Sequence, residues 1–521
     1  MLEATCCKGA YAAEENYSAE CCLAIQLWAQ RQKWHRCSSA SLAIPHRRVS
    51  LESCVKVDGI GAFDHVCRAR IFEQLLRQED LHSLVPFVRL WYATQSQFLW
   101  SDSEGVRHLI TQGDGGEQGD ALMPALFSLA LHPALERIRA LLPQGCYVFA
   151  YLDDVYVVCD RDQVVESLRM VGEVLRDTCH IDVNIGKLAA WSKEISPPPA
   201  GLDAFGENIW KSDLAPEYCG IKVLGTPLGT PEFINSFCQE VADEKMQLIN
   251  RIPKLSSLQS SWLLLYFCVV PRINHLLRTL PPQLVRAAAE RHNSDVLALF
   301  RELFMIPGHR VWNTRMHGVS FGTWVKQSRL PLRLGGCGLR DAVRTRHAAY
   351  WASWADCLPD LVRRFPGIRQ GVLAQLSALQ ALDMDTHHVG GQYLVAAETA
   401  GKHCREHGWN DRPLWLDVAS GLRPTQPSHD HTTLGEWQHG WQFHASDSLE
   451  RDAWNLLLQE LALPSVRSNA VSSGKTRLRS CMGPFAAVWL TVCPSSDGLI
   501  LTNWDLIHVC HVEAAWHRSG L

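Results

Sequence analysis

The sequence predicts an α+β protein in which a small antiparallel sheet backed by helices is followed by a mostly helical region. Residues 51–229 alternate short apolar runs with stretches of helical spacing, whereas helical spacing dominates from about residue 231 onward. Within the first part, VFAYLDDVYVV at 148–158 places two aspartates between apolar runs, as a β-hairpin places its turn between strands. The 521 residues are enough for about two to four domains.

The elements expected within residues 51–230 follow from periodicity and from turn-forming residues. Strands are expected at 55–57, at 106–110, in two runs joined by a turn at Asp153–Asp154, and at 221–228. Helices are expected at 68–78, 81–100, 119–142 and 162–179, and a proline-rich loop at 196–206. Residues 1–50 show little periodicity and form a poorly defined N-terminal segment.

The second half of the chain combines helical spacing with a local excess of positive charge. Helices are expected at 233–251, 258–280, 283–305 and about 339–402. Residues 251–350 hold 15 lysines and arginines against 4 acidic residues, a net +11, although the whole chain is −4. Such a segregated basic block is typical of a surface that binds a phosphate backbone.

Composition favours an intracellular protein, nuclear or cytoplasmic, that is neither secreted nor bound in a membrane. The 19 cysteines form no C-x-x-C motif, and MLEATCCKGAYAAEENYS at the start contains no apolar signal segment. We therefore expect reduced, mostly buried thiols. The longest apolar run, at 262–270, is about half the ~18 residues that a membrane span needs.

Three carboxylates are candidates for a metal site. Asp58 ends an apolar strand, and Asp153 and Asp154 lie between two others. A solvated turn is the simpler explanation of an Asp-Asp pair. Apolar strands on both sides favour a bound cation instead, because like charges pressed against a core repel each other. Carboxylates from neighbouring strands could hold two Mg²⁺ ions, or Mn²⁺, for phosphoryl transfer. Asp64 is better explained as an acid at a helix start.

Five segments follow one another in the order and spacing of the palm motifs of reverse transcriptases: KVDGIGAFDHV, GGEQGDALMPALF, AYLDDVYVV, NIGKLAAW and VLGTPLG. The chain most resembles the non-LTR (LINE-type) retrotransposon branch of that family. The resemblance implies an RNA-directed DNA polymerase that uses an RNA template, a DNA primer and dNTPs; no protein partner is evident. The expected regions are a palm at 51–230, a basic helical thumb-like domain at 231–335, a helical connection at 336–405 and a Trp/His-rich C-terminal region at 406–521.

The resemblance implies roles in catalysis for several residues. Asp58 and Asp153 match the principal metal ligands, and Asp154 completes the triad. Lys187 matches the lysine that gives a proton to the departing pyrophosphate, although a lone surface lysine is the simpler explanation. Phe63 matches the aromatic residue that excludes a ribose 2′-hydroxyl by steric clash, and is otherwise an ordinary core residue.

It also implies contacts with the substrates. Gln118 and Gly119 match the segment that touches the incoming nucleotide and the template, although a helix start explains this glycine almost as well. Tyr151 matches the aromatic residue near the primer end, and Leu224 and Gly225 match the tight hairpin that grips the primer terminus.

The chain departs from a complete reverse transcriptase before Asp58. No convincing fingers region precedes it, since HRR at 46–48 is a weak candidate, and Ala121 stands where the family usually has proline. We therefore expect a truncated polymerase domain whose activity the missing region could abolish. The alternative is a non-catalytic retroelement remnant that binds nucleic acid through the basic 251–350 region.

Two further segments could bind phosphate or metal. GDGGEQG at 113–119 lacks the G-K-[ST] that would complete a phosphate-cradling loop. The spacing of four metal-capable residues near the end fits no closed zinc pattern: His508, Cys510, His511 and His517.

Overall fold

A computed structural model describes most of the chain from residue 52 onward. The described residues are 52–117, 119–143, 146–312, 319–364, 369–382, 392–424 and 440–461, with short pieces at 478–479, 482–483 and 502–503. The chain divides into two compact units, Met1–Ile234 (unit 1) and Asn235–Leu521 (unit 2). The expected N-terminal segment 1–50 and the histidine-rich residues 508–517 lie outside the described residues.

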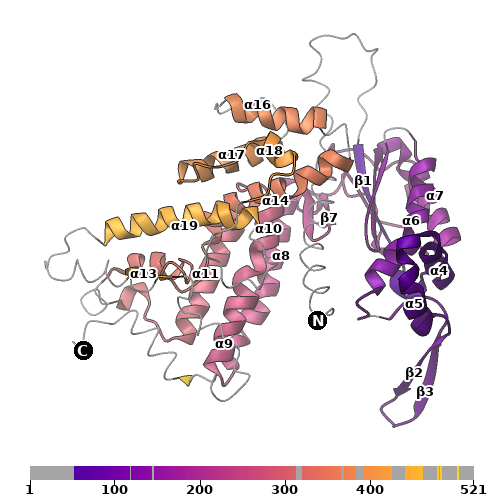
Figure 1. Cartoon of the computed structure of the whole chain (residues 1–521), viewed down its shortest axis with the longest axis horizontal. Coiled ribbons are helices and arrows are strands. Elements are labelled where there is room, and N and C mark those ends of the chain that lie inside the picture. The colour runs from indigo at the N-terminus through magenta and orange to yellow at the C-terminus, as the bar shows by residue number, and fades with distance from the viewer. Residues whose placement is uncertain are drawn as a thin grey trace. The chain divides into compact units, whose positions relative to one another are not determined.

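Unit 1 combines one four-stranded antiparallel sheet with helices and two separate hairpins (Figure 1). The sheet has the order β4-β5-β1-β6 and consists of β1 (Glu52–Asp58), β4 (Tyr147–Tyr151), β5 (Asp154–Asp160) and β6 (Ala189–Ser192). The helices are α3 (Ala62–His65), α4 (Arg68–Arg77), α5 (Val85–Tyr92), α6 (Met123–Leu141) and α7 (Val164–Cys179). Short 3₁₀ turns occupy Glu79–Leu84, Arg161–Gln163, Ile185–Lys187, Leu202–Phe205 and Pro216–Tyr218. This small antiparallel sheet with helices is the predicted α+β architecture.

The two faces of the sheet have different environments because side chains alternate along each strand. Val55 and Val57 of β1 and Val155 and Val157 of β5 are buried in one core with α4, α6 and α7. Figure 1 shows these helices grouped on one side of the strands of unit 1. Alternation therefore sends the side chains of the intervening positions, Asp58 among them, to the opposite face.

The chain after α5 was predicted wrongly. Residues 81–100 were expected to be one helical stretch, but helix α5 ends at Tyr92, and β2 (Ser96–Ser101) pairs with β3 (Arg107–Gln112). Cross-strand pairs such as Phe98 with Ile110 stabilise this hairpin, and a local helical pattern cannot anticipate them.

Two turns also differ from expectation. The hairpin of β4 and β5 turns at Leu152–Asp153 rather than Asp153–Asp154, because Tyr151 pairs with Asp154 in the ladder. Residues 221–228 form a hairpin, β7 (Gly220–Val223) and β8 (Thr226–Gly229), instead of one strand. Positive φ angles of 46° and 79° at Leu224 and Gly225 reverse the chain there.

Unit 2 is helical in its described residues (Figure 1). Its regular helices, with α8 beginning just before the unit boundary, are α8 (Pro231–Ile249), α9 (Leu258–Leu264), α10 (Asn274–Thr279), α11 (Arg286–Leu303), α13 (Phe321–Ser328), α14 (Ala342–Arg364), α16 (Ala374–Leu382), α17 (Gln392–Glu406), α18 (Trp415–Ala419) and α19 (Trp441–Glu460). Short 3₁₀ turns lie at Ile252–Lys254, Val270–Ile273 and His309–Val311, and π turns at Leu265–Val269 and Arg369–Leu373. Helix α14 is central, since it packs against α10, α11, α17, α18 and α19.

The expected helix at 258–280 is interrupted between α9 and α10. A π turn at Leu265–Val269 passes into a 3₁₀ turn at Val270–Ile273. Pro271 has no amide hydrogen to donate to the preceding turn, so it cannot continue a regular α-helix. The finer predicted boundaries at 231, 336 and 406 are not tested by the two-unit division and stay predictions.

None of the helices in the described part of the chain is both long enough and apolar enough to span a bilayer. All eleven cysteines within the described residues are free, and Cys268 is the exposed one among them.

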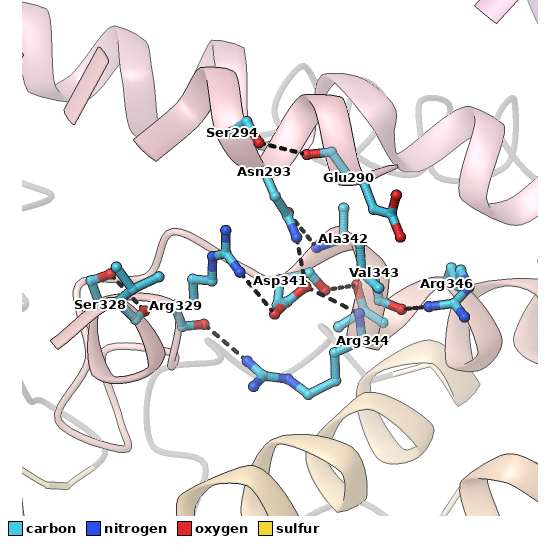
Figure 2. Close-up of polar contacts among 12 residues, drawn as sticks. Glu290, Asn293, Ser294, Ser328, Arg329, Asp341, Ala342, Val343, Arg344 and Arg346 are labelled. Atoms are coloured by element: carbon cyan, nitrogen blue, oxygen red, sulfur yellow. Dashed lines mark hydrogen bonds and ion pairs between the residues drawn. The ribbon is translucent and has the colours of Figure 1, made fainter. Parts of the chain in front are cut away.

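Asp341 joins three segments of unit 2 just before α14 (Figure 2). Its Oδ1 accepts hydrogen bonds from Asn293 Nδ2 at 2.7 Å and from the amide of Arg344 at 3.1 Å, and its Oδ2 lies 3.6 Å from Arg329 Nη1. Arg344 Nη2 in turn donates to the carbonyl oxygen of Arg329 at 3.1 Å. Burial alone would raise the pKa of Asp341, but the charges of Arg344 and Arg329 and the bond from Asn293 hold it below its usual range.

We expect Asp341→Asn to destabilise unit 2 in a pH-dependent way. A carboxyl whose folded pKa is lowered stabilises the fold above its unfolded pKa of about 3.9, and this contribution disappears as the pH falls through the lower folded value. The variant should therefore lose about 2–3 kcal/mol at pH 7, and its deficit relative to the wild type should shrink below pH ~4.

Urea unfolding monitored by tryptophan fluorescence measures this difference, because Trp351 and Trp354 are buried in α14. Asp360→Asn is the matched control, since Asp360 forms an exposed i,i+3 pair with Arg363 in the same helix and should contribute little. An equal effect of both substitutions, or a deficit that does not change with pH, would contradict this account of Asp341.

Candidate active site

The structure brings the three predicted carboxylate residues together at one end of the sheet. Asp58 is the last residue of β1 and pairs directly with Asp154, the first residue of β5. Asp153 precedes it in the hairpin turn. Burial raises the pKa of Asp153, and the negative charges of Asp154 and Asp58 raise it further, while Lys187 opposes them. All three carboxyl groups therefore share one electrostatic environment.

A lysine lies against each of the two paired carboxylates. Lys187 Nζ is 3.0 Å from Asp58 Oδ2, and Lys56 Nζ is 3.1 Å from Asp154 Oδ1. Lys187 ends the 3₁₀ turn Ile185–Lys187, which is held to the sheet because the amide of Asn184 donates to the carbonyl oxygen of Asp58 at 2.8 Å. The hydrogen bond to Asp58 and the charge of that carboxylate raise the pKa of Lys187, so it is protonated at neutral pH.

The site has the chemistry of a divalent-cation site, although it is not preassembled as one. No group of three or more His, Cys, Asp or Glu side chains is arranged to hold a metal ion within the described part of the chain. The donors are nevertheless carboxylate oxygens, which Mg²⁺ and Mn²⁺ prefer. Burial is the main cause of the raised pKa of Asp153, but the charges of Asp154 and Asp58 add to it, and each of these two carboxylates already has an ammonium group beside it, so the carboxylates here attract cations.

Phe63 lies beside this end of the sheet, in α3. Its ring stacks on that of Phe127 in α6, with centroids 4.3 Å apart, and it stays partly exposed. Asp64, in the first turn of the same short helix, fits the expected helix-start acid. Gly119 has φ 100° and no neighbouring atom that would meet a Cβ, so its backbone conformation favours glycine. Gln118 lies outside the described residues.

The β7–β8 hairpin is anchored close to the carboxylates. The amide of Leu224 donates to Tyr156 Oη at 3.1 Å, and Tyr156 lies two residues after Asp154 in β5. Tyr151 ends β4 and pairs with Asp154. The predicted primer-side residues Tyr151, Leu224 and Gly225 are thus joined to the strands that carry the carboxylates.

Sequence reasoning missed a buried arginine that fixes the segment before Gln118. Arg68 is 4% exposed, and its guanidinium donates to the carbonyl oxygens of Gly115 (2.7 Å) and Thr94 (2.7 Å) and to Ser96 Oγ (2.9 Å). Arg68 is the first residue of α4, where a positive charge interacts unfavourably with the helix dipole. This unfavourable position is the one feature of the sequence that indicates a role for Arg68 outside its own helix.

The same segment is held at its far end by a tyrosine. Tyr92 Oη donates to Asp120 Oδ2 at 2.5 Å, and the amide of Glu117 donates to Tyr92 Oη at 3.4 Å. The guanidinium of Arg68 lies 5.2 Å from the centre of the Tyr92 ring. Residues on both sides of Gln118 are therefore fixed to α4 and α5 by side chains that no predicted motif includes.

The basic block of unit 2 is partly neutralised within the fold. Fourteen of its fifteen basic residues are described, and six of them form ion pairs with carboxylates: Arg278–Asp356, Arg286–Glu290, Arg291–Asp243, Lys326–Glu460, Arg329–Asp341, and Arg333 with Asp447 and Glu450. Five others are exposed and have no carboxylate partner among the described residues: Arg251, Lys254, Arg272, Arg310 and Arg340. The surface charge is smaller than the sequence count suggests.

Residues 30–226 match the family described as "Reverse transcriptase (RNA-dependent DNA polymerase)". The match begins before the expected palm boundary at residue 51 and ends within the β7–β8 hairpin. No curated protein matches the sequence.

Two of the solved structures with some likeness are telomerases, each in complex with the TWJ fragment of telomeric RNA. The telomerase of Candida albicans has 9% identity and a TM-score of 0.27, with 61% of this chain and 48% of that chain covered. The telomerase of Candida tropicalis has 12% identity and a TM-score of 0.25, with 67% and 49% covered. This chain spans about half the length of either, and likeness at this level supports no functional argument.

The family match contains every residue predicted for the site, from Asp58 to Gly225. Residues 30–226 are therefore similar to the reverse transcriptase family.

Proposed function

We propose that this chain is an RNA-directed DNA polymerase that transfers nucleotides from dNTPs to the 3′-hydroxyl of a DNA primer on an RNA template. The main support is the convergence of Asp58, Asp153 and Asp154 at one end of a sheet, inside the region of the family match. The non-LTR retrotransposon origin and an intracellular setting belong to the same proposal.

In this proposal Asp58 and Asp153 are the principal ligands of two Mg²⁺ ions, or Mn²⁺, and Asp154 is the third carboxylate beside them. Bound cations of this kind supply neutralisation of phosphate charge and activation of the attacking hydroxyl. Lys187 holds a proton on Nζ next to Asp58, and its side chain is 64% exposed, so it can reach a departing pyrophosphate.

Other residues orient the substrates. The Phe63 ring, fixed by stacking on Phe127, limits the space on the 2′ side of the incoming sugar. Arg68 and Tyr92 hold the segment that contains Gln118 and Gly119 for contact with nucleotide and template. Tyr151 and the Leu224–Gly225 turn support the primer end, because both are attached to the strands that carry the carboxylates. Such positioning accounts for a large part of catalysis in phosphoryl transfer.

Primer extension on poly-A/oligo-dT with Mg²⁺ tests the proposal directly. We expect the wild-type chain to extend the primer, and Asp153→Asn or Asp58→Asn to reduce the rate by about 10²–10³-fold or more, because each removes a charged ligand of the metal ions that neutralise the reacting phosphate. Asp162→Asn is the matched control, since Asp162 is 91% exposed in unit 1 and should leave the rate unchanged.

If the wild-type protein is folded but extends no primer, the proposed polymerase activity is wrong. The sequence similarity would then reflect common ancestry alone. Equal loss of activity in Asp162→Asn would show that the carboxylates near β1 have no special role.

Phe63→Ala should weaken discrimination against ribonucleotides. Removing the ring opens space for a 2′-hydroxyl, so the preference for dNTP over rNTP should fall by about 10–100-fold. The ratio of kcat/KM for dTTP and UTP measures this preference. Phe72→Ala controls for lost packing, because Phe72 is also a partly buried phenylalanine packed on the core of unit 1. The same dNTP preference in Phe63→Ala and wild type would contradict the assigned role.

The alternative function, a non-catalytic nucleic-acid binder, is favoured by the exposed basic residues of unit 2. If Arg251 and Lys254 contact phosphates, the double variant Arg251→Ala/Lys254→Ala should reduce the slope of log K against log salt on single-stranded nucleic acid by about 1.4. Arg286→Ala/Arg291→Ala is the control, because both of these arginines are already paired with carboxylates. Binding that does not depend on salt would exclude this alternative.

A further inference from the structure

Lys56 is a second cation at the proposed active site that no motif assigns. It lies in β1 two residues before Asp58, so both side chains point to the face of the sheet opposite the α6–α7 core. In the ladder Lys56 pairs with Tyr156, and Asp58 pairs with Asp154. This register makes Lys56 the diagonal neighbour of Asp154, and its Nζ lies 3.1 Å from Asp154 Oδ1.

The two lysines at the site differ in how firmly they are held. Lys187 ends a short 3₁₀ turn, and its side chain is 64% exposed. Lys56 lies in the middle of β1, between β5 and β6, and its side chain is 23% exposed. Its direct ladder neighbours are Tyr156, which is fully buried, and Ala189. A metal ion or a nucleotide can therefore displace Lys187 into solvent more readily than Lys56, which is partly buried within the sheet beside Asp154.

The ammonium group of Lys56 limits the ability of the Asp154 carboxylate to bind a metal ion. At 3.1 Å it neutralises Asp154 and occupies Oδ1, and it repels any second cation that approaches the same carboxylate. Asp58 and Asp153 are not affected in this way, because the cation beside Asp58 is the exposed Lys187.

We propose that Lys56 is the permanent counter-ion of Asp154, so that metal binding depends on Asp58 and Asp153 while Asp154 is not a metal ligand. This inference rests on the proposed function and refines it: it assigns the ligand set within the carboxylate triad. Lys56 is then a positioning residue that holds Asp154 and lowers the net charge of the site.

Mn²⁺ titration of the full chain without nucleic acid, with free Mn²⁺ measured by electron paramagnetic resonance, tests the ligand set. We expect Asp58→Asn to weaken Mn²⁺ binding by about tenfold or more, and Asp154→Asn to change it less than about threefold. Lys56→Met should tighten binding by about tenfold or add a second site, because it releases Asp154. Adding Asp154→Asn to Lys56→Met should cancel that gain.

Lys56→Arg keeps the charge and should bind Mn²⁺ like the wild type, which separates the effect of charge from an effect of substitution on folding. If Asp154→Asn weakens Mn²⁺ binding as much as Asp58→Asn while Lys56 is present, the inference is wrong and the proposed function stands. Additive effects of Lys56→Met and Asp154→Asn would also overturn it. Mn²⁺ binding that does not depend on Asp58 would instead remove the proposed metal site, and this inference with it.

Discussion

The antiparallel register between β1 and β5 is the constraint on which the candidate site depends. Seven consecutive residue pairs, from Glu52 with Asp160 to Asp58 with Asp154, fix which side chains share a face. A shift of one residue would send Asp58 toward the valine core and the valines toward the opposite face, where the carboxylates lie. The register is secured because Val55 and Val57 are buried beneath α6 and α7. Hydrophobic burial in this core therefore determines where the charged groups stand.

Charge at this end of the sheet is balanced by side chains of the chain itself. Two carboxylates are each matched by an ammonium group, and the third, Asp153, has a raised pKa because burial and its neighbours disfavour its charge. A sheet end with three uncompensated carboxylates would destabilise the fold by repulsion. Lysine pairing removes much of that repulsion, and the exposed member, Lys187, can leave when another cation arrives. The carboxylate end of the sheet can therefore be stable without a ligand and still bind a cation, because the bound cation takes the place of Lys187.

Local patterns predicted the elements whose determinants are local. The strand that ends at Asp58, the helices α4, α6 and α7 and the hairpin around Asp153 follow from periodicity and turn residues. The errors concern contacts between distant segments. Residues 96–101 form a strand because 107–112 pair with them, and the turn shifted by one residue because the ladder extends to Asp154. The partners of Arg68, at Thr94, Ser96 and Gly115, are 26–47 residues away, so no spacing rule could reveal them.

The basic block, residues 251–350, shows that a count of charges in the sequence is weaker evidence for a phosphate-binding surface than the ion pairs seen in the structure. Its net +11 comes from the sequence, yet several of its arginines pair with acids that lie outside residues 251–350, such as Asp243, Asp356 and Asp447. Arg329 and Arg344 surround Asp341 and fix the start of α14, so their charges hold unit 2 together. A guanidinium that is paired in this way is less available to a phosphate, because moving away would leave the charge of a half-buried carboxylate unpaired. The carboxylate end of unit 1 therefore carries more of the functional argument than the basic surface does.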